Sequence, residues 1–257
     1  MIRTKLGLLG LCTVAFGLMA FGASSAQAES GAKWLILNSA GEKKESPVPL
    51  AGAIDLEADS PVLVLHTEIL KIKVLVLCTG AKAANANLLA NGSIGKEMVA
   101  GQPVGTQFLF TGCTVDLNNV AAPECTPNDP VDGAGKIFTK PLHGLLVLYD
   151  LGGGVKDDVA KILPDAAALH SPFVTIVLPV GCPVGTSIPI IGELAVQDCE
   201  KFALIHLAKH LVDVFTPLTS LFAISLTVEH QATLLGSVWT KLIGAAHMGL
   251  SWSGDWA

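Results

Sequence analysis

The sequence has 257 residues, a net charge of −6 and a mean hydropathy of +0.56. Only 15% of the residues are charged, and lysine and arginine occur without long runs. A surface that binds nucleic acid needs clustered basic side chains, so nucleic acid is excluded as an expected partner. The length suits one large all-β domain or two smaller ones, and the 51% hydrophobic content can form a sizeable core.

The N-terminal segment has the pattern of a bacterial secretory signal peptide. Arg3 and Lys5 precede an apolar run over residues 6–21, and Ala-Gln-Ala at residues 26–28 is a small-x-small cleavage site. We therefore expect residues 1–28 to be removed on export. No later stretch is long and apolar enough to predict a membrane-spanning segment after this cleavage.

The remaining chain, residues 29–257, reads as one secreted β-rich domain, since no linker rich in Pro, Gly or Ser divides it. Short apolar segments that alternate with polar residues predict strands. The expected strands cover residues 33–37, 62–65, 69–77, 104–111, 136–139, 142–149, 159–163, 173–178, 187–196, 222–229 and 233–238. Three glycines at residues 152–154 predict a hairpin loop. We expect an all-β, mostly antiparallel β-sandwich or distorted β-barrel.

Two segments favour helix instead. Residues 83–90 are rich in alanine and leucine, which favours a short helix. Residues 201–215 are long enough for a helix and have a fair amphipathic pattern. We expect one short helix near residues 201–215, although a strand is the alternative there.

Five cysteines remain after export, because Cys12 lies within the apolar run of the signal peptide. An exported protein can form disulfides, and an odd number leaves at least one thiol unpaired. The most local pairs are Cys113 with Cys125 and Cys182 with Cys199, each stabilising by roughly 3 kcal/mol. Cys78 with Cys182 is an alternative, and the spacings match no paired CxxC pattern of a zinc site.

The sharpest chemical signal in the sequence consists of His206, His210 and Asp213. On a helix, two histidines four residues apart share a face and can bind Zn²⁺ or Cu²⁺, with Asp213 as a third ligand. A metalloprotease has glutamate directly after the first histidine, whereas Leu207 stands here. We expect an ordinary solvated face and no cofactor, with the metal site as the alternative.

Other polar and aromatic groups give weaker signals. Asp55, Glu57 and Asp59 alternate but lack the glycine of a calcium loop, so a solvated edge is favoured. The pair Asp157-Asp158 suggests a polar turn. No Gly-x-Ser-x-Gly motif is present to indicate a hydrolase. Sugar-binding surfaces also use clustered tryptophans, which this chain has near its C-terminus at Trp239, Trp252 and Trp256.

Several fragments resemble uncharacterised secreted β-rich proteins of soil actinobacteria. They are Trp-Leu-Ile-Leu-Asn at residues 34–38, Phe-Leu-Phe-Thr-Gly-Cys at 108–113 with Cys125, and Gly-Lys-Ile-Phe-Thr-Lys-Pro-Leu-His-Gly-Leu at 135–145. The closing Gly-Leu-Ser-Trp-Ser-Gly at residues 249–254 also fits. The resemblance implies an exported β-barrel or sandwich with a local disulfide after Gly112-Cys113. It implies no activity.

These features predict an exported, non-enzymatic structural or binding protein of the cell envelope or the extracellular space. Two alternatives remain open. One is a secreted metal-dependent hydrolase that uses His206, His210 and Asp213. The other is a carbohydrate-binding module that contacts cell-surface sugars through the C-terminal tryptophans.

Overall fold

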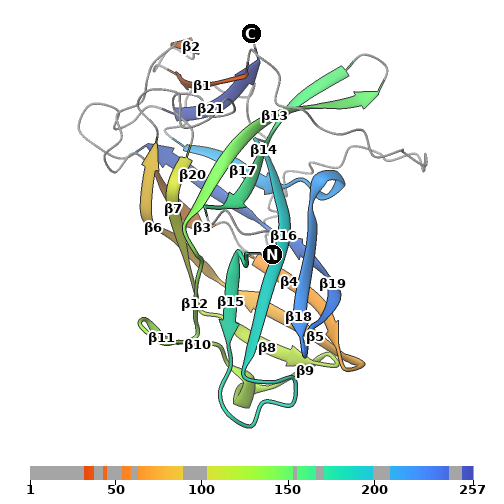
Figure 1. Cartoon of the computed structure of the whole chain (residues 1–257). Helices are drawn as coiled ribbons and strands as arrows, with labels where there is room; N and C mark the ends of the chain where they lie inside the picture. The colour runs from red at the N-terminus through yellow and green to blue at the C-terminus, as the bar shows by residue number, and fades with distance from the viewer. Residues whose placement is uncertain are drawn as a thin grey trace, which may run out of the picture.

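A computed structural model describes residues 32–37, 43–44, 54–58, 63–88, 103–152, 155–165, 171–198, 209–242 and 251–256. The described chain is nearly all β, which confirms the predicted fold class. Most strands belong to one large curled sheet that forms a half-barrel (Figure 1). A small sheet brings the first and last described segments together, with β1 paired to β21.

The strand boundaries follow the alternation of the sequence closely in the middle of the chain. In chain order the strands are β1 Ala32–Leu37, β2 Lys43–Lys44, β3 Ile54–Ala58, β4 Leu63–Ile69, β5 Ile72–Cys78, β6 Gly80–Leu88, β7 Pro103–Thr111, β8 Thr114–Leu117, β9 Val120–Ala121, β10 Asn128–Asp129, β11 Gly133–Ala134, β12 Lys136–Phe138, β13 Leu142–Gly152, β14 Val155–Pro164, β15 Val174–Val177, β16 Ser187–Asp198, β17 Lys209–Val214, β18 Ser220–Ser225, β19 Val228–Leu235, β20 Ser237–Leu242 and β21 Ser251–Trp256. Two short 3-10 helices, η1 Pro123–Cys125 and η2 Thr216–Leu218, lie between them.

Most strands of the large sheet form two rows, and β12, with β10 and β11 beside it, extends the sheet from β7. One row runs β3–β20–β17–β16–β14–β13–β7–β6, and it curls so that β6 lies next to β3. The other runs β15–β16–β18–β19–β4–β5–β8–β9. Among the described pairs only β10 with β12 is parallel, so the predicted antiparallel character is confirmed.

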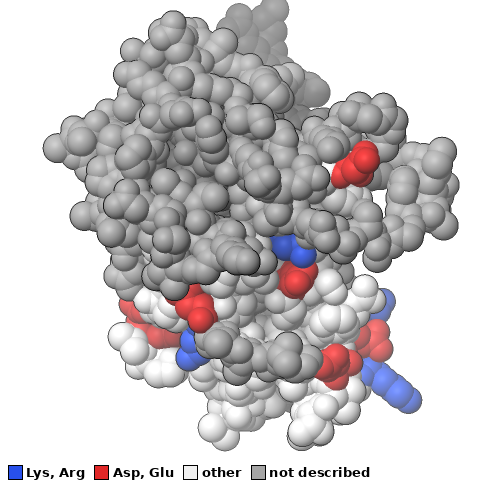
Figure 2. All heavy atoms as spheres, turned by 45° about the horizontal axis from the view of Figure 1, so that its top comes forward, with Lys and Arg blue, Asp and Glu red and all other residues white. Residues whose placement is uncertain are grey.

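Charged side chains of opposite sign lie beside one another on the described surface. Figure 2 shows acidic and basic residues interspersed over the part of the molecule that is not grey. In that view the described residues form no continuous face of one sign. The surface field on this side is therefore mixed rather than strongly positive or negative.

Strand β16 connects the two rows. Its first half pairs with β15 and β18, and its second half, from Leu194 onward, pairs with β14 and β17. The change of partners occurs next to Gly192, whose φ is +118°. A Cβ on this residue would lie 2.1 Å from the Ser220 carbonyl oxygen. Glycine is therefore required here, both for its backbone conformation and for its close approach to β18.

Two apolar clusters lie on opposite faces of β13, β14 and β16. The main core contains the fully buried Leu142, Ile176 and Ile188 among many others. The second cluster contains Val147, Val159, Ala195 and Phe215. Because neighbouring residues in a strand point to opposite faces, this part of the sheet is apolar on both sides.

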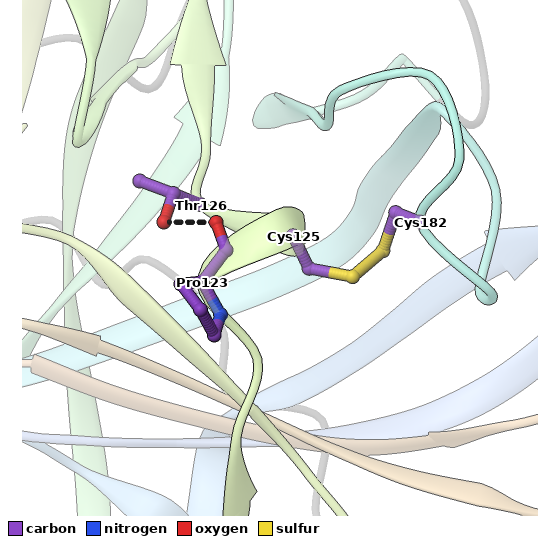
Figure 3. The surroundings of a disulfide bond; sticks show 4 residues. All are labelled: Pro123, Cys125, Thr126 and Cys182. Atoms are coloured by element: carbon purple, nitrogen blue, oxygen red, sulfur yellow. Dashed lines mark hydrogen bonds between the residues drawn. A yellow bond between two sulfur atoms is a disulfide. The ribbon is translucent and has the colours of Figure 1, made fainter.

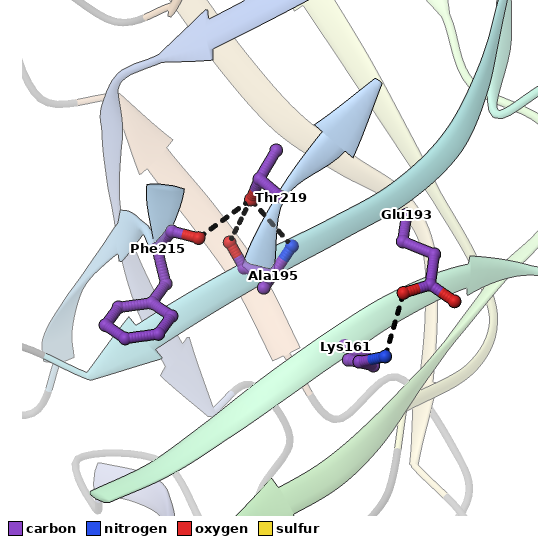
Figure 4. Close-up of polar contacts among 5 residues, drawn as sticks. All are labelled: Lys161, Glu193, Ala195, Phe215 and Thr219. Atoms are coloured by element: carbon purple, nitrogen blue, oxygen red, sulfur yellow. Dashed lines mark hydrogen bonds and ion pairs between the residues drawn. The ribbon is translucent and has the colours of Figure 1, made fainter. Parts of the chain in front are cut away.

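The second cluster is closed by the segment around η2. Ala195 N donates to Thr219 Oγ1 at 3.1 Å, and that hydroxyl reaches the Phe215 carbonyl oxygen at 2.9 Å (Figure 4). The Tyr149 and Phe215 rings meet edge to face with centroids 5.0 Å apart. The hydroxyl of Thr219 thus holds Phe215 against β16, where Phe215 packs in the second cluster.

Two disulfides are present in the described chain. One joins Cys78 to Cys113, and the other, drawn in Figure 3, joins Cys125 to Cys182. All four cysteines are buried. The expected pairs Cys113 with Cys125 and Cys182 with Cys199 are therefore wrong, as is the alternative of Cys78 with Cys182. Cys199 lies outside the described residues.

Strand pairing explains why closeness in sequence failed to predict these bonds. Leu77 pairs with Thr114 across β5 and β8, so the neighbouring Cys78 and Cys113 face each other. Cys125 in η1 lies instead beside the loop between β15 and β16, which carries Cys182 (Figure 3). The local disulfide implied by the family resemblance is replaced by bonds that span 35 and 57 residues.

Both helix expectations are wrong where the structure describes the chain. Residues 209–214 form β17, which pairs with β16 and β20, and residues 83–88 belong to β6. The amphipathic pattern is overridden because this segment fills the place between two strands of the curled sheet. Residues 201–208 and 89–90 lie outside the described residues.

Candidate functional site

A shallow polar groove crosses the outer face of β19, β4 and β5. It is a hollow of about 250 Å³ that is open to solvent. Seven of the lining residues are polar: His66, Thr67, Glu68, Lys73, Asn119, Gln231 and Thr233. Because it gathers acidic, basic, imidazole, amide and hydroxyl groups in one hollow, we treat it as the candidate site.

The alternation of each strand places most of these side chains outside. In β4, Leu65, Thr67 and Ile69 are buried, whereas His66 and Glu68 are exposed. The same period of two buries Ala232 and Leu234 of β19 and exposes the residues between them. The groove is therefore built from the solvent face of strands whose other face belongs to the main core.

The strand register places the groove residues at two successive levels along β19, β4 and β5. Thr233 pairs with His66, and His66 pairs with Leu75. One step further along the strands, Glu68 pairs with Lys73. A carboxylate and an ammonium group on adjacent strands thus lie at one level, with an imidazole at the next level on the same face.

Two hydrogen bonds fix the backbone under the groove. Thr67 Oγ1 donates to the Gln231 carbonyl oxygen at 3.0 Å and ties β4 to β19. Lys73 N donates to Asn118 Oδ1 at 3.0 Å and holds the β8–β9 turn against β5. That turn brings Asn119 to the groove.

The chemistry of the groove is that of binding. It presents one acidic, one basic and several amide or hydroxyl groups on a rigid sheet face. Such a set can contact both charged ends of a small zwitterionic ligand. The groove is open, so its charges act in a well-solvated setting, where each contact contributes little and affinity needs several contacts together.

A second polar constellation lies between β13 and the residue that follows β14. His143 Nδ1 and Asp165 Oδ1 are 3.0 Å apart, with both side chains partly exposed. Asp165 N also donates to the Pro141 carbonyl oxygen at 2.9 Å. The pair closes the end of the β13–β14 hairpin, which is a structural role.

The predicted metal ligands are not brought together on a helix. His206 lies outside the described residues, whereas His210 and Asp213 belong to β17 and pair with Thr240 and Ser237. Only helical periodicity would place these residues on a shared face, because residues three apart do not share a face in a strand. Within the described residues, no three His, Cys, Asp or Glu residues are gathered in a way that could hold a metal ion.

The other sequence signals fall in strands. Asp55 and Glu57 belong to β3 and pair with Lys241 and Trp239 of β20, while Asp59 lies outside the described residues. Trp252 and Trp256 belong to β21. Asp157 and Asp158 were expected in a turn but lie within β14. The hairpin expected around residues 152–154 is confirmed, because Gly152 pairs with Val155.

Sequence reasoning missed the groove. The alternation that exposes Lys73 was visible, but β19 lies more than 150 residues further along the chain than β4. Only the pairing of these strands brings Gln231 and Thr233 beside His66 and Glu68. A ladder of polar residues on neighbouring strands leaves no signal in a single sequence.

Among the described residues, none forms a helix with the length and apolar character needed to cross a membrane. Comparison of the chain with protein-family models, with curated proteins and with solved structures gave no match.

Proposed function

We propose that this chain is an exported, non-enzymatic binding protein of the cell envelope, and that the groove on β19, β4 and β5 is its binding surface. The observation that carries the proposal is the pair of buried disulfides, Cys78–Cys113 and Cys125–Cys182. Structural disulfides form and persist in oxidising compartments outside the cytosol. The signal-like pattern of residues 1–28 points to the same destination.

A binding role fits the polar chemistry better than catalysis does. None of the described cysteines is a free thiol, since all four are bonded. The groove offers charges of both signs and amides on an open face, whereas catalytic sites typically exclude water around a positioned nucleophile and base. The groove is thus suited to holding a polar group without changing it.

Export can be tested with the full chain in a bacterial host. Cells are separated into cytosol, envelope and medium, and thiols are labelled with a maleimide reagent before and after reduction. We expect a shortened protein in the envelope or medium, with Cys78, Cys113, Cys125 and Cys182 labelled only after reduction. Full-length protein in the cytosol, labelled without reduction, would contradict export.

Binding at the groove can be tested on the purified protein by calorimetry with O-phosphoethanolamine, a probe with an ammonium and a phosphate group. We expect weak saturable binding that is lost in a Glu68→Gln/Lys73→Met variant. Lys82→Met, which removes an exposed lysine on β6, serves as the matched control and should bind as the wild type does. Equal binding by both variants would remove the groove from the proposal.

A further inference from the structure

Exposed aliphatic side chains gather at one end of the second row of strands. Seven large hydrophobic residues are exposed in the described chain. Five of them are carried by turns or by strand ends at this end: Leu70, Val120, Val180, Leu226 and Val228. We call these five residues the apolar edge. Of the other two, Val131 belongs to the β10–β11 turn, which is not part of this row of strands, and Leu235 lies at the opposite end of β19.

The register places three hairpin turns side by side along this edge. The turns are Leu70-Lys71 between β4 and β5, Asn118-Asn119 between β8 and β9, and Leu226-Thr227 between β18 and β19. Because Ala232 pairs with Thr67, the start of β19 lies level with the first turn. Asn118 N donates to the Lys73 carbonyl oxygen at 2.9 Å, so the second turn lies level with it as well.

The loop between β15 and β16 completes the edge. Ile190 pairs with Ala223, which places the first residue of β16 level with Leu226. That loop carries Val180, which is 95% exposed, and Cys182 ties the loop to η1. Figure 1 shows this loop and the β4–β5 hairpin at the lower end of the molecule, far from the β1–β21 sheet.

Turn formation does not explain why leucine occurs at two positions of the apolar edge. Both central residues of each turn have positive φ, with Leu70 at +53° and Leu226 at +48°. Two-residue hairpin turns of this type favour Asn, Asp and Gly, and leucine is disfavoured at positive φ. Asn118, at +51°, has the favoured residue type in the same position. Leucine therefore adds conformational cost and an exposed apolar side chain to two turns where asparagine would fit better.

The shape of the apolar edge indicates a deformable binding partner rather than a rigid, flat protein surface. Successive turns along the row are two strands apart, about 10 Å, so the aliphatic side chains stand on separate tips rather than on one flat face. The tight turns close the strand ends, which leaves no free strand for an added β-strand at this edge. Separate apolar tips can each enter a deformable apolar layer, as interfacial membrane segments do.

The polar residues of the same turns fit the headgroup region of a bilayer. Lys71 follows Leu70, Thr227 follows Leu226 and Asn119 precedes Val120. Glu68, Asp116 and Glu229 offset Lys71 and Lys73 near the edge. The edge therefore has no basic excess, so its charge complements zwitterionic headgroups better than anionic ones.

We propose that the apolar edge docks this protein on a zwitterionic lipid bilayer, with Leu70 and Leu226 inserted at the interface and the polar groove beside the headgroups. The inference rests on the proposed envelope location and names the partner there. Its test uses purified protein and vesicles, so it can fail while export and phosphoethanolamine binding hold.

The test is flotation of the full purified chain with phosphatidylcholine vesicles, with and without phosphatidylglycerol. The decisive variant is Leu70→Asn/Leu226→Asn, because asparagine fits these turns and should preserve or raise thermal stability. Leu235→Asn is the matched control, because it replaces an exposed leucine at the other end of β19.

We expect the wild type and Leu235→Asn to float equally well with both vesicle types, and the double variant to lose binding at least about tenfold. Absence of wild-type binding, or equal binding by the double variant, would overturn the proposal. So would binding that requires phosphatidylglycerol and disappears in high salt. Self-association in sedimentation that the double variant abolishes would assign the edge to a protein interface instead.

Discussion

Gly192 lies against the backbone of Ser220 so closely that a Cβ at position 192 would be 2.1 Å from the Ser220 carbonyl oxygen. This contact lies where β16 passes from one row of strands to the other. Because the two backbones lie this close, β16 can pair with strands of both rows. The main core therefore extends from the β13–β14 hairpin to the β18–β19 hairpin.

Gly192→Ala is therefore expected to destabilise the fold by about 3 kcal/mol or more, since the Cβ meets backbone atoms that cannot move aside cheaply. Urea unfolding checks this value. Gly185→Ala is the matched control, because Gly185 also has a strongly positive φ of +102° but has no atom within 4 Å of a Cβ among the described residues. Its loss should reflect backbone strain alone, about 1 to 2 kcal/mol. Equal losses in the two variants would contradict the close approach.

Thr106 and Thr139 are both buried and should respond in opposite ways to substitution by valine. Thr139 Oγ1 accepts from Phe108 N at 2.8 Å, whereas Thr106 Oγ1 has no hydrogen-bond partner among the described residues. Thr139→Val should cost about 1–3 kcal/mol, and Thr106→Val should be neutral or stabilise by about 1 kcal/mol. Thermal unfolding of the two variants is the measurement. A comparable loss from both would show that Thr106 has a partner.

The Thr219 hydroxyl is expected to contribute measurably to the free energy of unfolding. Thr219→Val removes the acceptor of Ala195 N and the donor to the Phe215 carbonyl oxygen. We expect a loss of about 1–3 kcal/mol in urea unfolding, with recovery in Thr219→Ser. Thr126→Val, which removes a hydroxyl bond from an exposed 3-10 turn, should change stability by less than about 0.5 kcal/mol. A Thr219→Val variant as stable as the wild type would show that the hydroxyl contributes nothing to stability.

Each disulfide should stabilise the fold by about 4 kcal/mol in the loop-entropy model, because both close loops of intermediate length. The variants Cys78→Ala/Cys113→Ala and Cys125→Ala/Cys182→Ala should lower the urea midpoint by similar amounts. The bonds close 35 and 57 residues, which differ little on a logarithmic scale. A variant that unfolds like the wild type would show that its bond is absent or dispensable.

Alternation predicted most of the strands, and the turns explain where the prediction failed. Residues 69–77 and 222–229 were each expected as one strand, yet turns interrupt them at Leu70-Lys71 and Leu226-Thr227. Neither turn contains the glycine or asparagine that normally marks a hairpin. That signal is absent because leucine, one of the exposed residues of the apolar edge, occupies the first position of each turn.

Long-range pairing could not be predicted from the sequence. Cys78 meets Cys113 because β5 pairs with β8, and the groove exists because β19 pairs with β4. His210 was placed on a helix, since local pattern cannot show that β16 and β20 leave a place for a strand between them. The local alternation of polar and apolar residues determines which face of a strand is polar, whereas the strands that pair with it are determined by the fold of the whole chain.

The most direct test of the account is a map of the disulfides in the exported protein. The protein is collected from the envelope or the medium, its thiols are blocked, and it is digested without reduction for mass spectrometry. We expect peptides that join Cys78 to Cys113 and Cys125 to Cys182. Free thiols at these positions, or a peptide that joins Cys113 to Cys125, would contradict it.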